Sequence, residues 1–225
     1  MRLHLILRPI EPMEITPPNT CPFDDCRGEQ IRHYQTVGKP LRDTVRDEVQ
    51  VERYLCLECG RTFRVYPRGV THAQIPQRVK DLGVLLHLVG LSYGATSRAL
   101  EALGIYLSKS SVYEAVHAVA KGKPDLKQNQ VFAEVRTSDL DSGSIRVRYN
   151  GHWVILKLTF DDTGRLVLSI DRISSEDAEI LQKQLEPTAE SIGVDLLVTN
   201  DTVSFKTTTD EMRQADRVSE SHIQT

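Results

Sequence analysis

The chain has 225 residues, of which 40% are hydrophobic, 26% charged and 6% aromatic. At about 100–200 residues per domain, this length predicts one or two domains or several small modules, and the composition excludes a fibre or a wholly disordered chain. No apolar run approaches the roughly 18–20 residues of a membrane helix, and the opening residues lack the features of a secretion signal. We therefore expect a cytoplasmic, nucleoid-associated protein with no membrane partner.

The net charge of −3 conceals two halves of opposite sign. Residues 1–130 contain 18 Lys and Arg against 14 Asp and Glu, whereas residues 131–225 contain 10 against 17. The basic excess is strongest in residues 61–123, with nine basic and three acidic side chains. This asymmetry favours a front half that binds a polyanion, although clustering on solvated surfaces would give the same counts.

The four cysteines form two close pairs, CPFDDC and CLEC. Two short turns that each present two thiolates can complete the tetrahedral shell that Zn2+ prefers, so we expect a structural zinc ion and a zinc ribbon over residues 20–70. Valines between the pairs would supply strands of the ribbon. Structural or redox cysteines without metal are the alternative. The expected ligands are Cys21, Cys26, Cys56 and Cys59.

The middle of the chain changes to helical periodicity. Apolar residues recur at helical spacing over residues 75–91, 93–103 and 108–120, with Gly104 as a stop and Ser108 as an N-cap. Two short helices around a glycine turn are typical of a helix-turn-helix, whose second helix enters the major groove, although a plain three-helix bundle has the same pattern. The residues expected to contact double-stranded DNA are Ser108, Lys109, Ser110, Ser111, Tyr113, Arg61, Arg64 and Arg68.

The acidic half predicts an antiparallel sheet and a long helix. Apolar stretches at Ile145–Tyr149, Trp153–Phe160 and Leu166–Ile170 are separated by turn residues, which indicates three strands in hairpins. A helix over 175–191 and a buried strand at Asp195–Thr199 follow.

A proline and a glycine are expected to affect the course of this predicted helix. Pro187 is expected to kink or interrupt it, and Gly193 to end it. A further helix is expected from near Val203. Three strands, a helix and another strand followed by acids give the element order of an RNase H-like core, in which carboxylates hold two metal ions.

Three stretches carry a resemblance that covers about residues 20–223: YLCLECGRTFRVYPRGV, GLSYGATSRALEALGIYLSKSSVYEAV and SSEDAEILQKQLEPTAESIGVDLLVTND. The chain resembles bacterial insertion-sequence transposases of the DDE class that have a zinc ribbon and a helix-turn-helix at the N-terminus. The resemblance implies DNA transposition: binding of transposon ends, recombination by DNA cutting and joining through Mg2+ held by two Asp and a Glu, and action as a homo-oligomer.

The acidic residues depart from this family. Ungapped alignment puts the first Asp at Gly143, and a two-residue shift puts it at Asp141. The position of the second Asp is occupied by Asn200, with Asp201 beside it. The chain ends before the third acid, so we expect a truncated, catalytically impaired copy that needs Mg2+ only if the site functions. Asp141 and Asp201 are the candidate catalytic residues.

The expected fold class is a multi-module α+β protein with a zinc ribbon, a helix-turn-helix module and a partial RNase H-like α/β domain. The boundaries are an N-terminal extension at 1–19, the ribbon at 20–70, the helix-turn-helix at 71–123 and the incomplete RNase H-like domain at 130–225. The alternatives are a non-enzymatic zinc-ribbon and helix-turn-helix transcriptional regulator, and a zinc-containing subunit that does not contact DNA.

Overall fold

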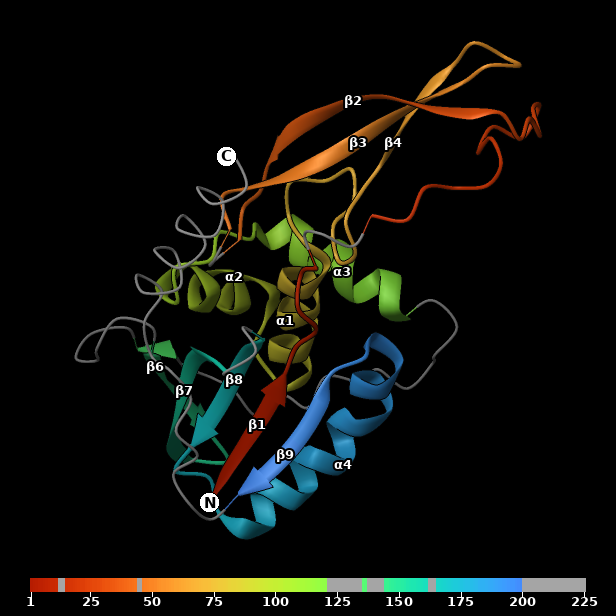
Figure 1. Cartoon of the computed structure of the whole chain (residues 1–225). Helices are drawn as coiled ribbons and strands as arrows, with labels where there is room; N and C mark the ends of the chain where they lie inside the picture. The colour runs from red at the N-terminus through yellow and green to blue at the C-terminus, as the bar shows by residue number, and fades with distance from the viewer. Residues whose placement is uncertain (12–14, 44–45, 121–134, 137–143, 162–164, 200–225) are drawn as a thin grey trace. The chain divides into compact units, whose positions relative to one another are not determined.

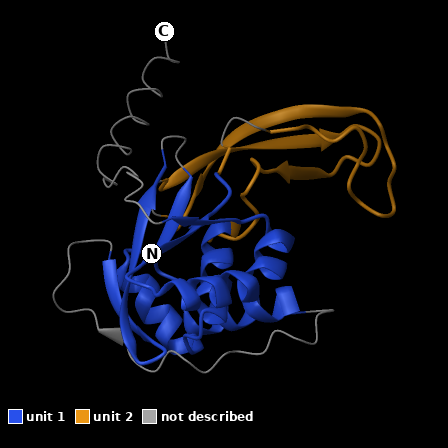
Figure 2. Cartoon of the chain, turned by 90° about the horizontal axis from the view of Figure 1, so that it is seen from below, with its two compact units in different colours: residues 1–9, 78–225 blue, residues 10–77 orange. Residues whose placement is uncertain are grey.

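The computed structural model of the chain describes residues 1–11, 15–43, 46–120, 135–136, 144–161 and 165–199. The structure is mixed α+β, with four helices and two antiparallel sheets in these ranges. It divides into two compact units (Figure 2): unit 1 comprises Met1–Pro9 and Arg78–Thr225, and unit 2 comprises Ile10–Gln77. No helix in the described ranges has both the length and the apolar character required to cross a membrane.

The sheet of unit 1 has the strand order β5-β6-β7-β8-β1-β9 (Figure 1), and all neighbours are antiparallel. The strands are β1 (Arg2–Ile6), β5 (Val135–Arg136), β6 (Ser144–Tyr149), β7 (His152–Phe160), β8 (Leu166–Asp171) and β9 (Asp195–Thr199). The three predicted strands of the acidic half are thus present as β6, β7 and β8. An Asn150-Gly151 turn with positive φ at both residues joins β6 to β7, as hairpin turns of two residues require.

Strand β1 corrects the prediction of an N-terminal extension at 1–19. Residues 2–6 instead lie between β8 and β9, and Leu3 and Leu5 are fully buried. The burial of β9 also differs from the prediction. This strand is at the edge of the sheet, and Leu197 is 42% exposed, so the prediction of a buried strand is wrong.

The helices of unit 1 match the predicted periodic segments. They are α1 (Gln77–Leu88), α2 (Tyr93–Ala102), α3 (Lys109–Ala120) and α4 (Ser175–Ile192), with residue Gln77 at the unit boundary. Helix α4 lies along β9 and β1 (Figure 1) and buries Ala178, Leu181 and Leu185. Of the two effects predicted for Pro187, a kink or an interruption, the interruption is absent, because α4 continues through Pro187 to Ile192.

The C-terminus of α4 requires a glycine. Gly193 has φ +70°, and a Cβ there would lie 1.8 Å from the Arg8 guanidinium. Arg8 Nε donates to the Gly193 carbonyl at 3.1 Å, which places a cation at the negative end of the helix dipole. Gly193 therefore ends the helix, as predicted, and lets the segment after β1 approach it.

Unit 2 contains the sheet β2-β3-β4, formed by β2 (Ile31–Pro40), β3 (Glu48–Cys56) and β4 (Thr62–Val65). Strands lie between the cysteine pairs, as predicted, and β4 follows the second pair. The hydrophobic cluster of the unit is small: it consists of Ile10, Leu41, Val49, Val51 and Val70, with Tyr66 packed against them.

Candidate metal centre and nucleic-acid surface

The four cysteines meet at one end of unit 2. Two of them lie before β2, Cys56 is the last residue of β3, and Cys59 lies in the turn to β4. All four Sγ atoms lie within 4.8 Å of one another. Cys21 Sγ lies 3.8 Å from Cys59 Sγ, and Cys26 Sγ lies 3.9 Å from Cys56 Sγ.

These distances fit a zinc ion. Zn–S bonds of about 2.3 Å in a tetrahedron place the sulfur atoms about 3.8 Å apart, whereas a disulfide requires about 2.05 Å. The four cysteines are free thiols in the structure, and their spacing is that of a thiolate shell. A shell of four thiolates leaves no open coordination position, so an ion held there would stabilise the fold rather than take part in a reaction.

Local backbone hydrogen bonds hold the two cysteine turns. The Cys21 N–H donates to Gly28 O at 2.8 Å, and the Gly60 N–H donates to Cys56 O at 2.9 Å. Gly60 has φ +69°, the left-handed conformation that closes this turn. Gly28 is required for a different reason: a Cβ there would lie 2.7 Å from the Glu58 carboxyl carbon and 3.0 Å from Cys56 Sγ.

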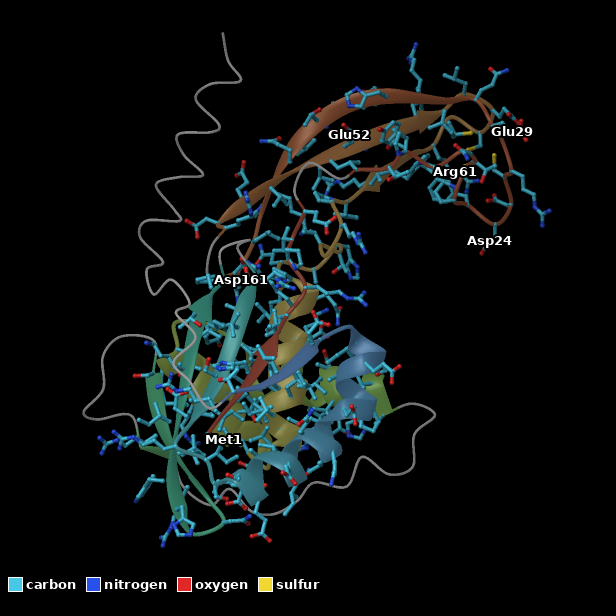
Figure 3. All side chains as sticks on the ribbon, turned by 60° about the horizontal axis from the view of Figure 1, so that its bottom comes forward. Met1, Asp24, Glu29, Glu52, Arg61 and Asp161 are labelled. Carbon is cyan, nitrogen blue, oxygen red and sulfur yellow. The ribbon has the colours of Figure 1, made fainter. Side chains whose placement is uncertain are left out.

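Arg61 supplies positive charge beside the thiols (Figure 3). Its Nη2 donates to Asp25 at 2.5 Å, its Nε donates to Cys59 Sγ at 3.5 Å, and its guanidinium lies 4.1 Å from the Phe23 ring centre. Hydrogen bonds from Arg61 lower the pKa of Cys59 to about 6, whereas burial raises the pKa of Cys21 to about 12. Cys59 is therefore the first of the four thiols to lose its proton, and a bound cation is needed to stabilise the other three as thiolates.

Aromatic side chains cover the cysteine end of the sheet. Phe63 lies between Phe23, at 6.4 Å in an edge-to-face arrangement, and Tyr54, at 6.1 Å in a stacked one. These rings supply the apolar burial that the small core of unit 2 lacks at this end. The sequence prediction missed them because single aromatic residues in predicted strands carry no metal signal.

The three arginines predicted to bind DNA differ in their surroundings. Arg61 is engaged with Asp25 and Cys59, and Arg68 forms an ion pair of 3.4 Å with Glu11. Arg64 is exposed on β4 and forms no ion pair with another described residue. Of the three, Arg64 offers its charge most directly to an external anion.

The predicted DNA-contact residues of α3 fall into two groups. Ser108 and Ser111 form the N-cap: Ser108 Oγ accepts the Ser111 N–H at 3.1 Å and lies 2.9 Å from Ser111 Oγ. Lys109, Ser110 and Tyr113 are instead exposed. The prediction that Ser108 is the N-cap is confirmed. Of the predicted contact residues on α3, the three exposed ones are accessible to a ligand.

A row of rings supports the exposed side of α3. Tyr113 lies 4.1 Å from His117 and 5.4 Å from Tyr93 of α2, measured between ring centres, and Tyr93 stacks on His87 of α1 at 4.3 Å. Burial lowers the pKa of His87, which keeps this ring neutral at pH 7. Tyr113 is 49% exposed, so the row fixes its position while leaving one side of the ring accessible.

The candidate catalytic residues Asp141 and Asp201, together with Gly143 and Asn200, lie outside the described residues. The strands next to them are β6 and β9, which are four steps apart in the order β6-β7-β8-β1-β9. Four steps of about 4.8 Å span about 19 Å, whereas the ions of a two-metal site are about 3.5–4 Å apart. The described sheet therefore does not place these strands side by side.

A buried polar cluster in the sheet of unit 1 was also missed. His4 on β1 is 2% exposed; its Nδ1 lies 2.7 Å from Ser169 Oγ and its Nε2 lies 3.0 Å from Thr199 Oγ1. Burial lowers the pKa of His4, and Arg2 adds to this, while Asp171 opposes it. A neutral imidazole thus links three adjacent strands.

Comparison of the chain with protein-family models, with curated proteins and with solved structures finds no match.

Proposed function

We propose that the chain is a DNA-binding protein of the transposase type, in which α2 and α3 act as a helix-turn-helix on duplex DNA and a zinc ion stabilises unit 2 as a ribbon. The observation that carries the proposal is the exposed N-terminal turn of α3. Lys109, Ser110 and Tyr113 are exposed there, while Val112, Ala115 and Val116 are buried on the other side of the helix.

The geometry of α3 suits a nucleic acid. The free N–H groups and the positive dipole at a helix N-terminus attract phosphate, and Lys109 adds a full charge at the same end. Serine hydroxyl groups can donate to phosphates or base edges, and a tyrosine can contact either. The connection from α2 to α3, residues 103–108, is longer than the three or four residues of the commonest helix-turn-helix turn.

The proposed activity is binding without efficient strand transfer. Two-metal phosphoryl transfer depends on carboxylate oxygens that neutralise charge in the transition state. Asn200 offers one uncharged amide oxygen where the family has an Asp, and Gly143 offers no side-chain ligand. We propose that the chain recognises transposon ends but does not cut and join them by itself.

DNA binding is tested with fluorescence anisotropy on a labelled duplex at low salt. Replacing Lys109 with Ala should weaken binding at least about fivefold, which corresponds to about 1 kcal/mol, and lower the salt slope by about 0.9. Lys183→Ala, which removes an exposed lysine from α4, is the matched control and should have no effect. Unchanged affinity of the Lys109 variant at low salt would remove α3 from the interface.

Catalysis is tested separately, with cognate ends and either Mg2+ or Mn2+ in a strand-transfer assay. The expected result is no product. Efficient strand transfer by the purified chain would contradict the binding-only proposal.

A transcriptional regulator is the second candidate function, and a cavity in unit 1 favours it. The cavity has a volume of about 460 Å3 and is lined by Tyr149, Trp153, Arg172 and Asp177, among others. This volume is in the range of small-molecule sites, and Trp153, which lines the cavity, is 37% exposed. Terminal inverted repeats beside the gene would favour the transposase, and an operator-like palindrome upstream would favour the regulator.

A further inference from the structure

One face of the β2-β3-β4 sheet carries basic side chains and no acidic ones. In antiparallel strands, residues opposite each other point to the same face. Arg53 is paired with Gln35 on β2 and with Arg64 on β4, and Leu55 is paired with Arg32 and Thr62. We call this the arginine face; its cations are Arg32, Arg53 and Arg64, and Lys39 at the end of the face where Val49 and Val51 are buried.

The composition of unit 2 does not explain why one face of this sheet carries only basic charged residues. Residues 10–77 contain nine basic and ten acidic side chains, so an even distribution would place acids on both sides. Glu48 and Glu52 of β3 instead alternate with Val49, Val51 and Arg53 and so point to the opposite face. The arginine face is therefore positive although the unit as a whole is nearly neutral.

The cations on this face influence one another. Burial lowers the pKa of Lys39, and the charge of Arg64 lowers it further. Arg32 and Arg64 are exposed and have no ion-pair partner among the described residues. An external anion would reduce the repulsion between these cations. Arg61 at the cysteine turn differs from them because Asp25 already neutralises its charge.

An aromatic side chain stands beside the cations. Tyr34 is the unpaired residue at the irregularity in β2 between His33 and Gln35, and it is 54% exposed. The Arg53 guanidinium lies 5.7 Å from the centre of its ring. Two hydrogen bonds from Arg53 to Thr62 Oγ1, at 3.1 and 2.7 Å, fix the guanidinium in this position.

We propose that the arginine face binds a single nucleic-acid strand, with phosphates along Arg32, Arg53 and Arg64 and an unpaired base stacked on Tyr34. Single-strand binding surfaces combine a track of cations with aromatic platforms, because every base has a π-face but few other polyanions do. The arginine face belongs to unit 2 and α3 belongs to unit 1, so the proposal goes beyond duplex recognition by α3 and does not depend on it.

The test uses the full zinc-loaded chain and a labelled oligothymidine strand, with binding followed by anisotropy between about 50 and 200 mM salt. The double variant Arg53→Gln, Arg64→Gln should bind at least about tenfold more weakly at the lower salt concentration, and its salt slope should fall by about 1.4, or about 0.7 for each lost phosphate contact. Tyr34→Leu should weaken binding at least about fivefold, because stacking of one base is lost.

Arg27→Gln is the matched control, since it removes one exposed arginine from the same unit outside the arginine face. Zinc content and circular dichroism confirm that each variant folds. Loss of oligothymidine binding in the arginine-face variants, with the control unchanged, supports the proposal. Unchanged binding in the double variant, or an equal loss in the control, would overturn it.

The duplex measurement on the Lys109 variant separates this proposal from the previous one. Arginine-face variants that lose only the single strand, and a Lys109→Ala variant that loses only the duplex, would support two surfaces. If Lys109→Ala weakens duplex binding while the double variant binds oligothymidine normally, the arginine face fails and the DNA-binding helix remains.

Discussion

Replacing Cys56 with Ser should unfold unit 2 selectively. The sulfur atoms lie 3.8 Å apart in the Cys21–Cys59 pair and 3.9 Å apart in the Cys26–Cys56 pair, close to the edge of about 3.8 Å in a tetrahedral site of four thiolates around zinc. Little rearrangement is therefore needed, and most of the binding free energy of about 10–16 kcal/mol contributes to folding. If four ligands share it equally, loss of one costs about 3 kcal/mol, or at least about a hundredfold in zinc affinity.

A cost of this size is a large fraction of the stability expected for so small a unit. Its buried cluster has five residues, and total domain stabilities are only about 5–15 kcal/mol. Competition with a zinc chelator and limited proteolysis measure the two consequences: the variant should release zinc at chelator concentrations at least about a hundredfold lower, and cleavage should accelerate between residues 31 and 65 but not in the sheet of unit 1.

Leu57→Ser is the matched control for this experiment. It introduces the same residue into the same turn, but Leu57 is 50% exposed and its side chain is not a metal ligand. Zinc release and proteolysis of this control should match the wild-type chain. A Cys56→Ser chain that releases zinc at the same chelator concentration as the wild-type chain would refute the four-thiolate site.

Two further perturbations test the stability of unit 1. The folded-state pKa of His4 lies below its ordinary value of 6.5 because the ring is buried. The unfolded chain therefore binds more protons, and the free energy of unfolding should fall as the pH drops below about 6.5. In urea titrations, His4→Gln should weaken this pH dependence, and the control His152→Gln, which replaces an exposed histidine, should not. Ser174→Ala removes the cap whose Oγ accepts the Asp177 N–H at 3.0 Å and should cost about 0.5–2 kcal/mol by thermal unfolding, whereas Ser175→Ala should cost less because its side chain is not the cap.

Local patterns in the sequence predicted most of the elements of unit 1. Helical periodicity predicted α1, α2 and α3 within a few residues, because each helix buries a stripe of its own apolar side chains. The Ser108 cap was equally local, since its hydroxyl group accepts the N–H of Ser111, three residues further along the chain. The four-cysteine cluster was predictable because Cys spacing alone sets the geometry of each turn.

The position of β1 could not be predicted in this way. The stretch RLHLI has only five residues, and its partners are distant: His4 and Ser169 are 165 positions apart. Nothing local distinguishes such a strand from an extension, because its burial is decided by the two strands beside it. The exposure of β9 was missed for the same reason, since an edge strand and a central strand can have the same apolar sequence.

The strand order also bears on the proposed loss of catalysis. An intact two-metal site would need carboxylates from two strands that approach within a few ångströms, and β1, β7 and β8 separate β6 from β9. The functional proposals depend instead on cations and hydroxyl groups that bind phosphate oxygens: Lys109 and Ser110 on α3, and the arginine face of unit 2. Such groups can hold a nucleic acid but do not bind the metal ions needed to cut it. If the proposed recognition of transposon ends is correct, the chain should compete with an active transposase for those ends and inhibit its strand transfer in a mixing assay.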